Sequence, residues 1–423
     1  MSALLLALNQ RTFASLRRHR NYRLFFTGQL VSVIGTWMQN IALAWLVVEL
    51  THSPLAVGLL AFCRFIPFTV LGLFAGVVAD RFDNRRLVIV TQATSMAFSA
   101  LLAVLVLTGP PPLWLIYVLA VLSSTALVFD APGRHALTFQ LVGREELSNA
   151  VSLNASLFNA SRVVGPALAG VLIAAFGVGV CFAINAVSFL AVLASLLLMR
   201  PAELVPLVRE GLPPTLMRGI REGLSYVRHT PQARLVLAIV TVVSTLGFNF
   251  HVILPLLASE TLDTGPRVFG ILSAFFGGGA LTGALLSAAL GRASWKVLVA
   301  GTGGFSLSLL ALAPVTTVWP AAVLLFATGA CFSLWTANAN TILQLGAPDQ
   351  LRGRVVSIYL WAFAGLAPVG GLLAGGLTEV GGTALSFTVA GGTGLAMTLV
   401  AGRQLKQRRD AALARVARAA SSS

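Results

Sequence analysis

The sequence predicts an all-α polytopic membrane protein, with twelve transmembrane helices in two pseudo-symmetric bundles of six. Of its 423 residues, 57% are hydrophobic and only 10% are charged, whereas a soluble domain carries about 25% charged residues. A spanning helix needs about 20 apolar residues, so this length holds roughly a dozen with short loops. The net charge of +15 would alone suggest a nucleic-acid partner, but the apolar fraction excludes a soluble nucleic-acid-binding protein.

The helices follow from apolar runs that glycine, proline or charged residues interrupt. The first six runs lie near 22–49, 54–79, 86–108, 113–138, 146–175 and 178–199. The second six lie near 233–258, 266–290, 294–314, 318–343, 350–378 and 382–402. This divides the chain into a cytoplasmic N-terminal segment, a first bundle, a cytoplasmic linker with an amphipathic helix, a second bundle and a basic cytoplasmic tail: 1–21, 22–199, 200–232, 233–402 and 403–423.

Basic residues predict the orientation, because lysine and arginine concentrate in cytoplasmic loops. Of the 29 such residues, only Arg64, Arg162 and Arg267 lie outside the two chain ends and one alternating set of loops. Two basic ends on one side also require an even number of spans. We therefore expect a multi-pass protein of the cell inner membrane with both termini cytoplasmic, and a basic tail that lies on anionic lipid.

The two halves resemble each other at glycine, proline and serine positions. A shift of 212 residues places Val31, Ser32, Gly35, Pro54 and Gly58 on Val243, Ser244, Gly247, Pro266 and Gly270. A shift of 205 residues aligns the fifth helix with the eleventh, including Gly165 with Gly370 and Gly170 with Gly375. These matches indicate an internal duplication, which is how many secondary transporters are built.

No sequence motif indicates an enzyme. The three cysteines, Cys63, Cys181 and Cys331, lie in apolar runs and behave as small hydrophobic residues, not as a disulfide or metal framework. The sequence contains no nucleotide-binding P-loop, no HExxH and no CxxC pair. The glycine-rich segment 277–280 lies inside an apolar helix, where we expect it to serve packing. We expect no cofactor and no metal.

The most specific string is GVVADRFDNRR, residues 76–86, between the second and third helices. Its charged side chains are close enough to form a hydrogen-bonded charge latch at the cytoplasmic mouth: Asp80, Arg81, Asp83, Arg85 and Arg86. An ordinary helix hairpin with a positive-inside loop explains the same composition equally well. Gly72 and Gly76, one helical turn apart, would let a neighbouring helix approach closely.

Gly76, Asp80, Arg81 and Arg85 resemble the G-x3-D-R-x-G-R-[RK] signature of the major facilitator superfamily, with Asp83 where that pattern usually has glycine. The surroundings look like its third drug:proton antiporter family, which includes enterobactin-type siderophore exporters and macrolide efflux proteins. The resemblance covers nearly the whole chain, is unspecific for substrate, and is carried by NYRLFFTGQLVSVIGTWMQNIALAWLV, LTHSPLAVGLL, FDAPGRHAL and ELSNAVSLNASLFNASRVVGPALAG (21–47, 50–60, 129–137, 146–170).

The resemblance implies the major facilitator fold and a cytoplasmic gate latch. In that superfamily the signature aspartate is held against basic residues, an acidic residue low in the fourth helix and the start of the eleventh helix. Asp130 fits the fourth-helix position, because it lies about 25 Å along a helix that begins near Leu113. Arg134 follows one turn later. An Asp–Arg pair at this spacing is also common on surfaces, and the resemblance favours the latch.

A second motif, Gly165 followed by Pro166, lies in the fifth helix. The proline removes a backbone donor and kinks the helix, while Ser161, Gly165 and Ala169 make a smooth strip for close packing. The pair looks like part of the antiporter motif of the resembled family and favours export over import. Taken without the resemblance, a Gly-Pro kink is common in membrane helices.

Two arginines lie inside predicted spans, where a charge is costly and marks a functional site by default. Arg64 lies near the middle of the second helix, with no acidic residue at that depth on any span. Its counter-charge is a substrate anion, a backbone carbonyl or water. Arg162 lies on a polar face of the fifth helix with Asn154 and Asn159, and either binds an acidic substrate or cross-links helices.

Proton coupling requires a group whose ionisation changes during the cycle, usually a membrane carboxylate or histidine. Many drug antiporters have an arginine in the middle of the fourth helix, whereas this sequence has Ser123, Ser124 and Thr125 there. The remaining candidates are Glu49, Asp130 and His251. Each also has a structural or interfacial interpretation.

In the resembled fold, the first, fourth, seventh and tenth helices line a central cavity. Aromatic and uncharged polar residues on these helices suit a bulky amphipathic ligand, although aromatic residues also pack helices and face lipid. Together with the buried arginines and the polar face of the fifth helix, the predicted substrate cavity comprises Gln39, Arg64, Ser124, Asn154, Asn159, Arg162, Asn249 and Asn338.

The sequence therefore predicts a monomeric secondary transporter that works by alternating access and exports a small amphipathic compound, drug-like or siderophore-like, in exchange for protons. Two alternatives stay open. One is a lipid or metabolite carrier, for example of lysophospholipid. The other is a receptor or scaffold that has kept the fold without transporting anything.

Overall fold

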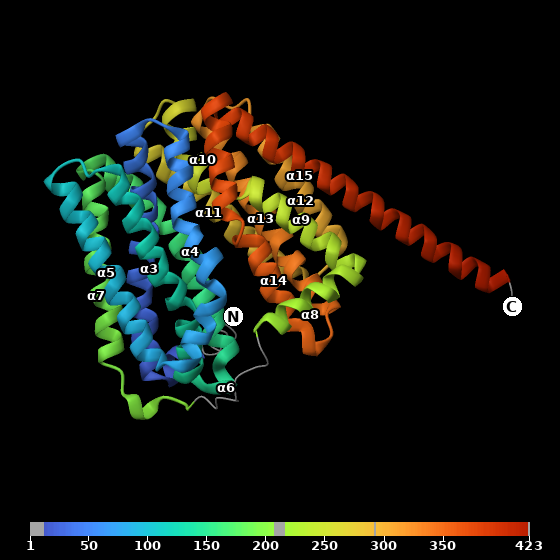
Figure 1. Cartoon of the computed structure of the whole chain (residues 1–423), viewed down its shortest axis with the longest axis horizontal. Coiled ribbons are helices and arrows are strands. Elements are labelled where there is room, and N and C mark those ends of the chain that lie inside the picture. The colour runs from blue at the N-terminus through green and yellow to red at the C-terminus, as the bar shows by residue number, and fades with distance from the viewer. Residues whose placement is uncertain (1–11, 207–215, 292, 422–423) are drawn as a thin grey trace, which may run out of the picture. The chain divides into compact units, whose positions relative to one another are not determined.

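The computed structural model describes residues 12–206, 216–291 and 293–421, which form helices without any strand (Figure 1). Ten of the described helical stretches are long and apolar enough to cross a membrane. The all-α membrane architecture predicted from composition is confirmed.

The first half of the chain contains a short helix, α2 (Ala14–Arg18), and five longer ones: α3 (Arg20–Thr51), α4 (Pro54–Arg81), α5 (Asn84–Thr108), α6 (Leu113–Phe176) and α7 (Val178–Leu197). The local sequence determines where two of these helices, α4 and α5, begin. The Ser53 hydroxyl accepts a hydrogen bond from the Ala56 amide, and Pro54 occupies the first turn, where its missing N–H costs nothing. Asp83 caps α5 by accepting from the Arg86 amide at 2.8 Å.

The second half contains α8 (Leu216–His229), α9 (Pro231–Gly247), α10 (Phe250–Leu256), the π-helix η2 (Leu257–Thr261), α11 (Pro266–Leu290), α12 (Trp295–Leu312), α13 (Val318–Gly346), α14 (Arg352–Ala364) and α15 (Ala367–Ser421). Two short 3-10 turns, η1 (Pro201–Glu203) and η3 (Asp349–Leu351), complete the described elements. The linker helix α8 begins and ends within the predicted linker.

Two helices are too long for one crossing. The 64 residues of α6 would extend about 96 Å at 1.5 Å per residue, against a hydrocarbon core of about 30 Å. Gly143 interrupts α6 with φ 70°, a backbone conformation that glycine adopts without strain. Gly382, at φ 67°, interrupts α15 in the same way. With each long helix counted as two crossings, the ten stretches give twelve.

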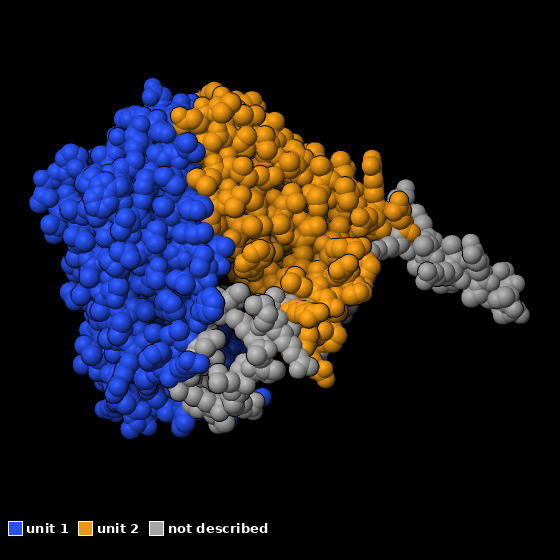
Figure 2. Space-filling model, in the orientation of Figure 1, with its two compact units in different colours: residues 1–212, 251–277 blue, residues 213–250, 278–423 orange. Residues whose placement is uncertain are grey.

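The chain divides into two compact units (Figure 2). Unit 1 comprises 1–212 and 251–277, and unit 2 comprises 213–250 and 278–423. The predicted bundles, in contrast, divide at the linker, so the segment 251–277 belongs to the second bundle in the prediction and to unit 1 in the structure. In unit 1, α3 packs against α6 and α7, while α5 also packs against both (Figure 1). In unit 2, α12 packs against α13 and α15.

Glycines set the closest helix approaches, as expected for the segment 277–280. In unit 2, a Cβ added at Gly279 would overlap the backbone carbonyl oxygen of Phe326 on α13, and one at Gly283 would overlap that of Ala330. Only residues without a side chain allow such backbone contact. The expectation for Gly72 is wrong, because no described atom lies within 4 Å of a Cβ added there.

Candidate functional site

Unit 1 contains a cavity of about 650 Å³, a size that suits a small organic ligand. Its apolar wall includes Val33, Leu43, Leu102, Leu119 and Phe158. Five residues predicted for the substrate cavity line it: Gln39, Arg64, Ser124, Asn154 and Asn159. The latch residues Asp130 and Arg134 line the same cavity, so the structure brings two predicted groups into one site.

Amide side chains are held in place around this cavity. The Gln39 Oε1 accepts a hydrogen bond from Asn185 Nδ2 at 2.7 Å, and the same nitrogen lies 3.2 Å from Ser99 Oγ. Asn154 Oδ1 accepts from the Tyr22 hydroxyl at 3.2 Å, and Asn159 Nδ2 donates to its own helix at Ala155. The polar groups are therefore oriented before any ligand arrives.

Arg64 lies on α4 with its guanidinium at the cavity wall. Its Nη2 donates to Asn40 Oδ1 on α3 at 2.8 Å. The next residue, Phe65, packs on the ring of His251, with 4.9 Å between the ring centroids. The Nε2 atom of His251 is buried and has no hydrogen-bond partner among the described residues.

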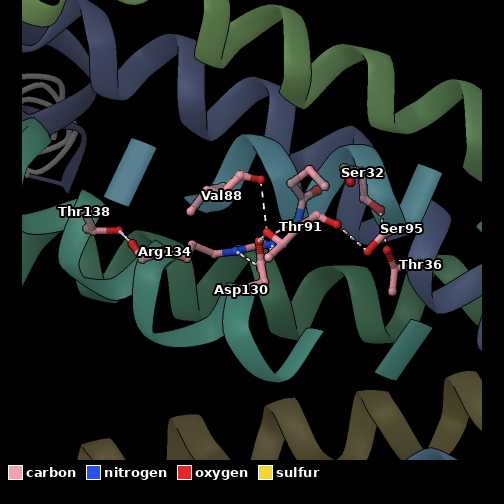
Figure 3. Close-up of polar contacts among 9 residues, drawn as sticks. Ser32, Thr36, Val88, Thr91, Ser95, Asp130, Arg134 and Thr138 are labelled. Carbon is pink, nitrogen blue, oxygen red and sulfur yellow. Dashed lines mark hydrogen bonds and ion pairs between the residues drawn. The ribbon is translucent and has the colours of Figure 1, made fainter. Parts of the chain in front are cut away.

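Asp130 is the most heavily bonded charge in the cavity wall (Figure 3). Its side chain is only 2% exposed. One oxygen, Oδ1, accepts from Thr91 at 2.8 Å and from Gln92 at 2.9 Å, both on α5. The other, Oδ2, accepts from Nε of Arg134 at 2.9 Å and also from its Nη2. The carboxylate thus ties α6 to α5 and neutralises Arg134.

The signature residues lie at the end of α4 and the start of α5, and the structure describes the side-chain surroundings of only some of them. Gly76 and Asp80 fall outside the residues whose side-chain surroundings are described, and Arg81 is the last residue of α4. Arg85 donates from Nε to the carbonyl of Leu196 at 2.8 Å, at the end of α7. A cation at a helix C-terminus is favourable for the helix dipole. Arg85 therefore fastens the start of α5 to α7.

Gly165 and Pro166 lie where helices cross in unit 1. A Cβ on Gly165 would overlap that of Trp37 on α3. Pro166 has no N–H for the carbonyl of Arg162 one turn earlier, and a Cβ added at Gly277 of α11 would lie 2.9 Å from that carbonyl oxygen. The Arg162 guanidinium lies 5.0 Å from the centre of the Phe276 ring, a cation–π contact, and Arg162 is not among the cavity-lining residues.

The remaining predicted residues lie elsewhere. Asn249 and Asn338 are buried in unit 2, where Asn249 Nδ2 donates to the Thr245 carbonyl at 2.8 Å. Asn338 Oδ1 accepts from the Ser294 amide just before α12 begins, at 3.0 Å. Glu49 accepts from Trp45 Nε1 at 2.6 Å within α3. The described contacts of these three residues are structural.

Four polar residues of the site were not predicted from the sequence: Asn40, Thr91, Gln92 and Asn185. Asn40 accepts from Arg64, Thr91 and Gln92 donate to Asp130, and Asn185 donates to Gln39. A signal was present in each case: all four interrupt apolar helices with a hydrogen-bonding side chain, which needs a partner inside a membrane.

A chain with twelve crossings and a partly polar cavity inside one unit is a membrane transporter, and the comparisons with known proteins agree. The chain belongs to the family of transmembrane secretion effectors, which it matches over residues 10–421. This family is part of the major facilitator superfamily, so the resemblance and the expectation of a transporter, not an enzyme, are confirmed.

Relatives along most of the chain are named as transporters. The staphyloferrin A transporter of Staphylococcus aureus is 26% identical over 371 residues, which cover 86% of this chain and 91% of the relative. Macrolide efflux protein A of Streptococcus pyogenes is 23% identical over 367 residues, which cover 85% of this chain and 90% of the relative. The enterobactin exporter EntS of Salmonella typhimurium is 26% identical, with 86% of each chain covered.

Solved structures confirm the fold. The nucleoside transporter NupG superposes with a TM-score of 0.71 at 12% identity, covering 92% of this chain and 99% of the other. A POT family transporter bound to a thioalcohol-conjugated peptide gives the same score of 0.71 at 11% identity, with 90% and 95% covered. The major facilitator fold predicted from the signature is therefore correct.

Proposed function

We propose that this protein is a secondary active transporter that works by alternating access and exports an amphipathic compound, drug-like or siderophore-like, in exchange for protons. The observation that carries the proposal is the cavity of unit 1, which combines apolar walls with fixed amides and two arginines, Arg64 and Arg134. Relatives named for staphyloferrin A, macrolides and enterobactin support export of such compounds.

In this proposal, charged side chains form the cytoplasmic gate latch. Asp130 and Arg134 would act with Asp80, Arg81 and Arg85 as a latch that favours one state of the carrier, and Gly165 and Pro166 would give the antiporter kink. The hydrogen bonds that Asp130 accepts from Thr91 and Gln92 support this role, because they connect α6 to α5 through the carboxylate. Loss of its charge would release Arg134 from its partner.

Three groups are candidates for carrying the exchanged proton. Asp130 is the strongest, since it lines the cavity and its charge has a direct structural consequence. His251 packs on Phe65, the residue after Arg64, and its Nε2 has no hydrogen-bond partner among the described residues. Glu49 accepts a hydrogen bond only from Trp45 among the described contacts and has the least support.

A transport measurement in proteoliposomes tests the coupling, with enterobactin, staphyloferrin A and erythromycin as probes. We expect that at least one probe drives a proton flux under an imposed pH gradient. Asp130→Asn should still move that probe down its gradient while the pH gradient no longer accelerates it, and Glu49→Gln should remain coupled. Probe movement in the unaltered protein without any proton flux would make it a facilitator, and neither flux would favour a scaffold.

We further propose that the protein acts as a monomer in the inner membrane, with both termini in the cytoplasm. A fusion of alkaline phosphatase, which is active only outside the cytoplasm, tests the orientation. We expect an active fusion after Pro111, in a predicted outer loop, and an inactive one after Gln404, at the start of the tail. The reverse pattern would contradict the orientation derived from basic residues.

A further inference from the structure

Arg64 is a cation in the cavity wall without a carboxylate partner in the described part of the chain. Its hydrogen bond there goes to Asn40, a neutral amide, and the ion pairs among the described residues involve other side chains. A guanidinium carries five N–H donors in a planar fork. The Asn40 Oδ1 atom accepts from one of these nitrogens, Nη2.

The other charges of the cavity wall cancel. Asp130 and Arg134 form an ion pair, and the only further ionisable residue among those that line the cavity is His135. Apart from His135, the wall therefore carries one net positive charge, at Arg64. A charge inside a membrane protein is costly unless an opposite charge or strong acceptors accompany it.

The surroundings of Arg64 provide apolar surface next to that charge. Val33 and Leu43 on α3 and Leu119 on α6 line the same cavity. The next residue, Phe65, packs its ring on His251, which contributes no negative charge. An oxyanion at Arg64 would thus have its counter-charge and, beside it, walls that suit a hydrocarbon or aromatic body.

We propose that Arg64 and Asn40 bind the carboxylate of an amphipathic organic acid, which makes such acids the substrate class of this cavity; this rests on the proposed function. Guanidinium and carboxylate match in a planar, two-pronged geometry. The two carboxylate oxygens of the ligand would accept hydrogen bonds from the N–H groups of Arg64 that do not donate to Asn40.

A binding experiment on the full-length protein in a non-ionic detergent tests the proposal. The probes are dodecanoate, as a membrane fatty acid, and cholate, as a free rigid acid, each paired with its methyl ester and kept below its micelle concentration. We expect at least one acid to raise the melting temperature while its ester does not. Arg64→Gln should weaken binding of that acid at least tenfold, and Arg64→Lys should weaken it less, because it keeps the charge without the fork.

A second variant keeps the test decisive if Arg64→Gln does not fold. Asn40→Asp would place a carboxylate on the side chain that Arg64 already contacts at 2.8 Å, so it should stabilise the fold and compete with the bound acid. We expect Asn40→Asp to lose acid binding, whereas Asn40→Gln should retain part of it.

The outcomes separate this inference from the proposed function. Equal binding of acids and esters, unchanged acid binding in Arg64→Gln or Asn40→Asp, or no binding of either acid would overturn the carboxylate site. Transport of erythromycin by the same purified protein, reconstituted into proteoliposomes, would leave the proposed function standing. A protein that neither binds nor transports any of these probes would contradict both.

Discussion

Replacing Asp130 by alanine should lower the stability of the purified protein by about 3 kcal/mol, because breaking a buried ion pair strands its partner. Arg134 would lose two hydrogen bonds, and Thr91 and Gln92 would lose their common acceptor. We place the effect at the lower end of the usual range, since the Arg134 side chain is 24% exposed. Thermal melting in detergent measures the loss.

Two controls make this prediction specific. The double variant Asp130→Ala with Arg134→Ala should recover part of the stability, because no unpaired charge remains, and the double-mutant cycle gives the coupling energy. Glu203→Ala breaks the pair between Arg200 and Glu203, whose side chains are 64% and 41% exposed, and should change stability by less than about 1 kcal/mol. Equal losses for Asp130→Ala and Glu203→Ala would show that Asp130 is not a structural joint.

The second large effect is expected at Gly279 in α11. Alanine there would place its Cβ against the carbonyl oxygen of Phe326, a backbone atom that can move only with α13. Overpacking of this kind typically costs about 1–3 kcal/mol. We expect Gly279→Ala to show reduced folded yield and a lower melting temperature.

The neighbouring glycine provides a matched control. A Cβ at Gly278 would lie 3.7 Å from a ring carbon of Phe326, an ordinary contact. Because alanine favours a helix over glycine by about 1 kcal/mol, Gly278→Ala should be neutral or slightly stabilising. If both substitutions had the same effect, the close approach of α11 to α13 would not be the cause.

Much of the fold could be predicted because the membrane restricts the choices. Long apolar runs with basic loops give helix number and order. Gly143 lies between the fourth and fifth runs, and Gly382 is the first residue of the twelfth. The division into units was harder. Residues 251–277 follow the linker in sequence, and whether they associate with one half or the other depends on packing partners such as Gly170, whose added Cβ would lie 2.9 Å from Pro266.

The site was predictable where a charge or a family motif marked it. Arg64 was evident from its depth in an apolar helix, where a charge is costly, and Asp130 from its match to the latch position of the resembled family. Their partners were not evident, because an asparagine or threonine in a membrane helix serves equally well as a packing residue, a bond within its own helix or a contact across helices. Asn40 crosses to Arg64, whereas Asn159 bonds to its own backbone, and sequence spacing does not distinguish the two.

The amide of Asn185 has a consequence for how unit 1 moves. It joins Gln39 on α3 and Ser99 on α5, so the angular position of three helices is fixed at one point. Successive residues of a helix point about 100° apart, and a turn of α7 by that angle would remove the amide from both partners in an apolar medium, which costs free energy. Rotation of α7 alone therefore costs these hydrogen bonds, whereas rotation of the three helices together keeps them.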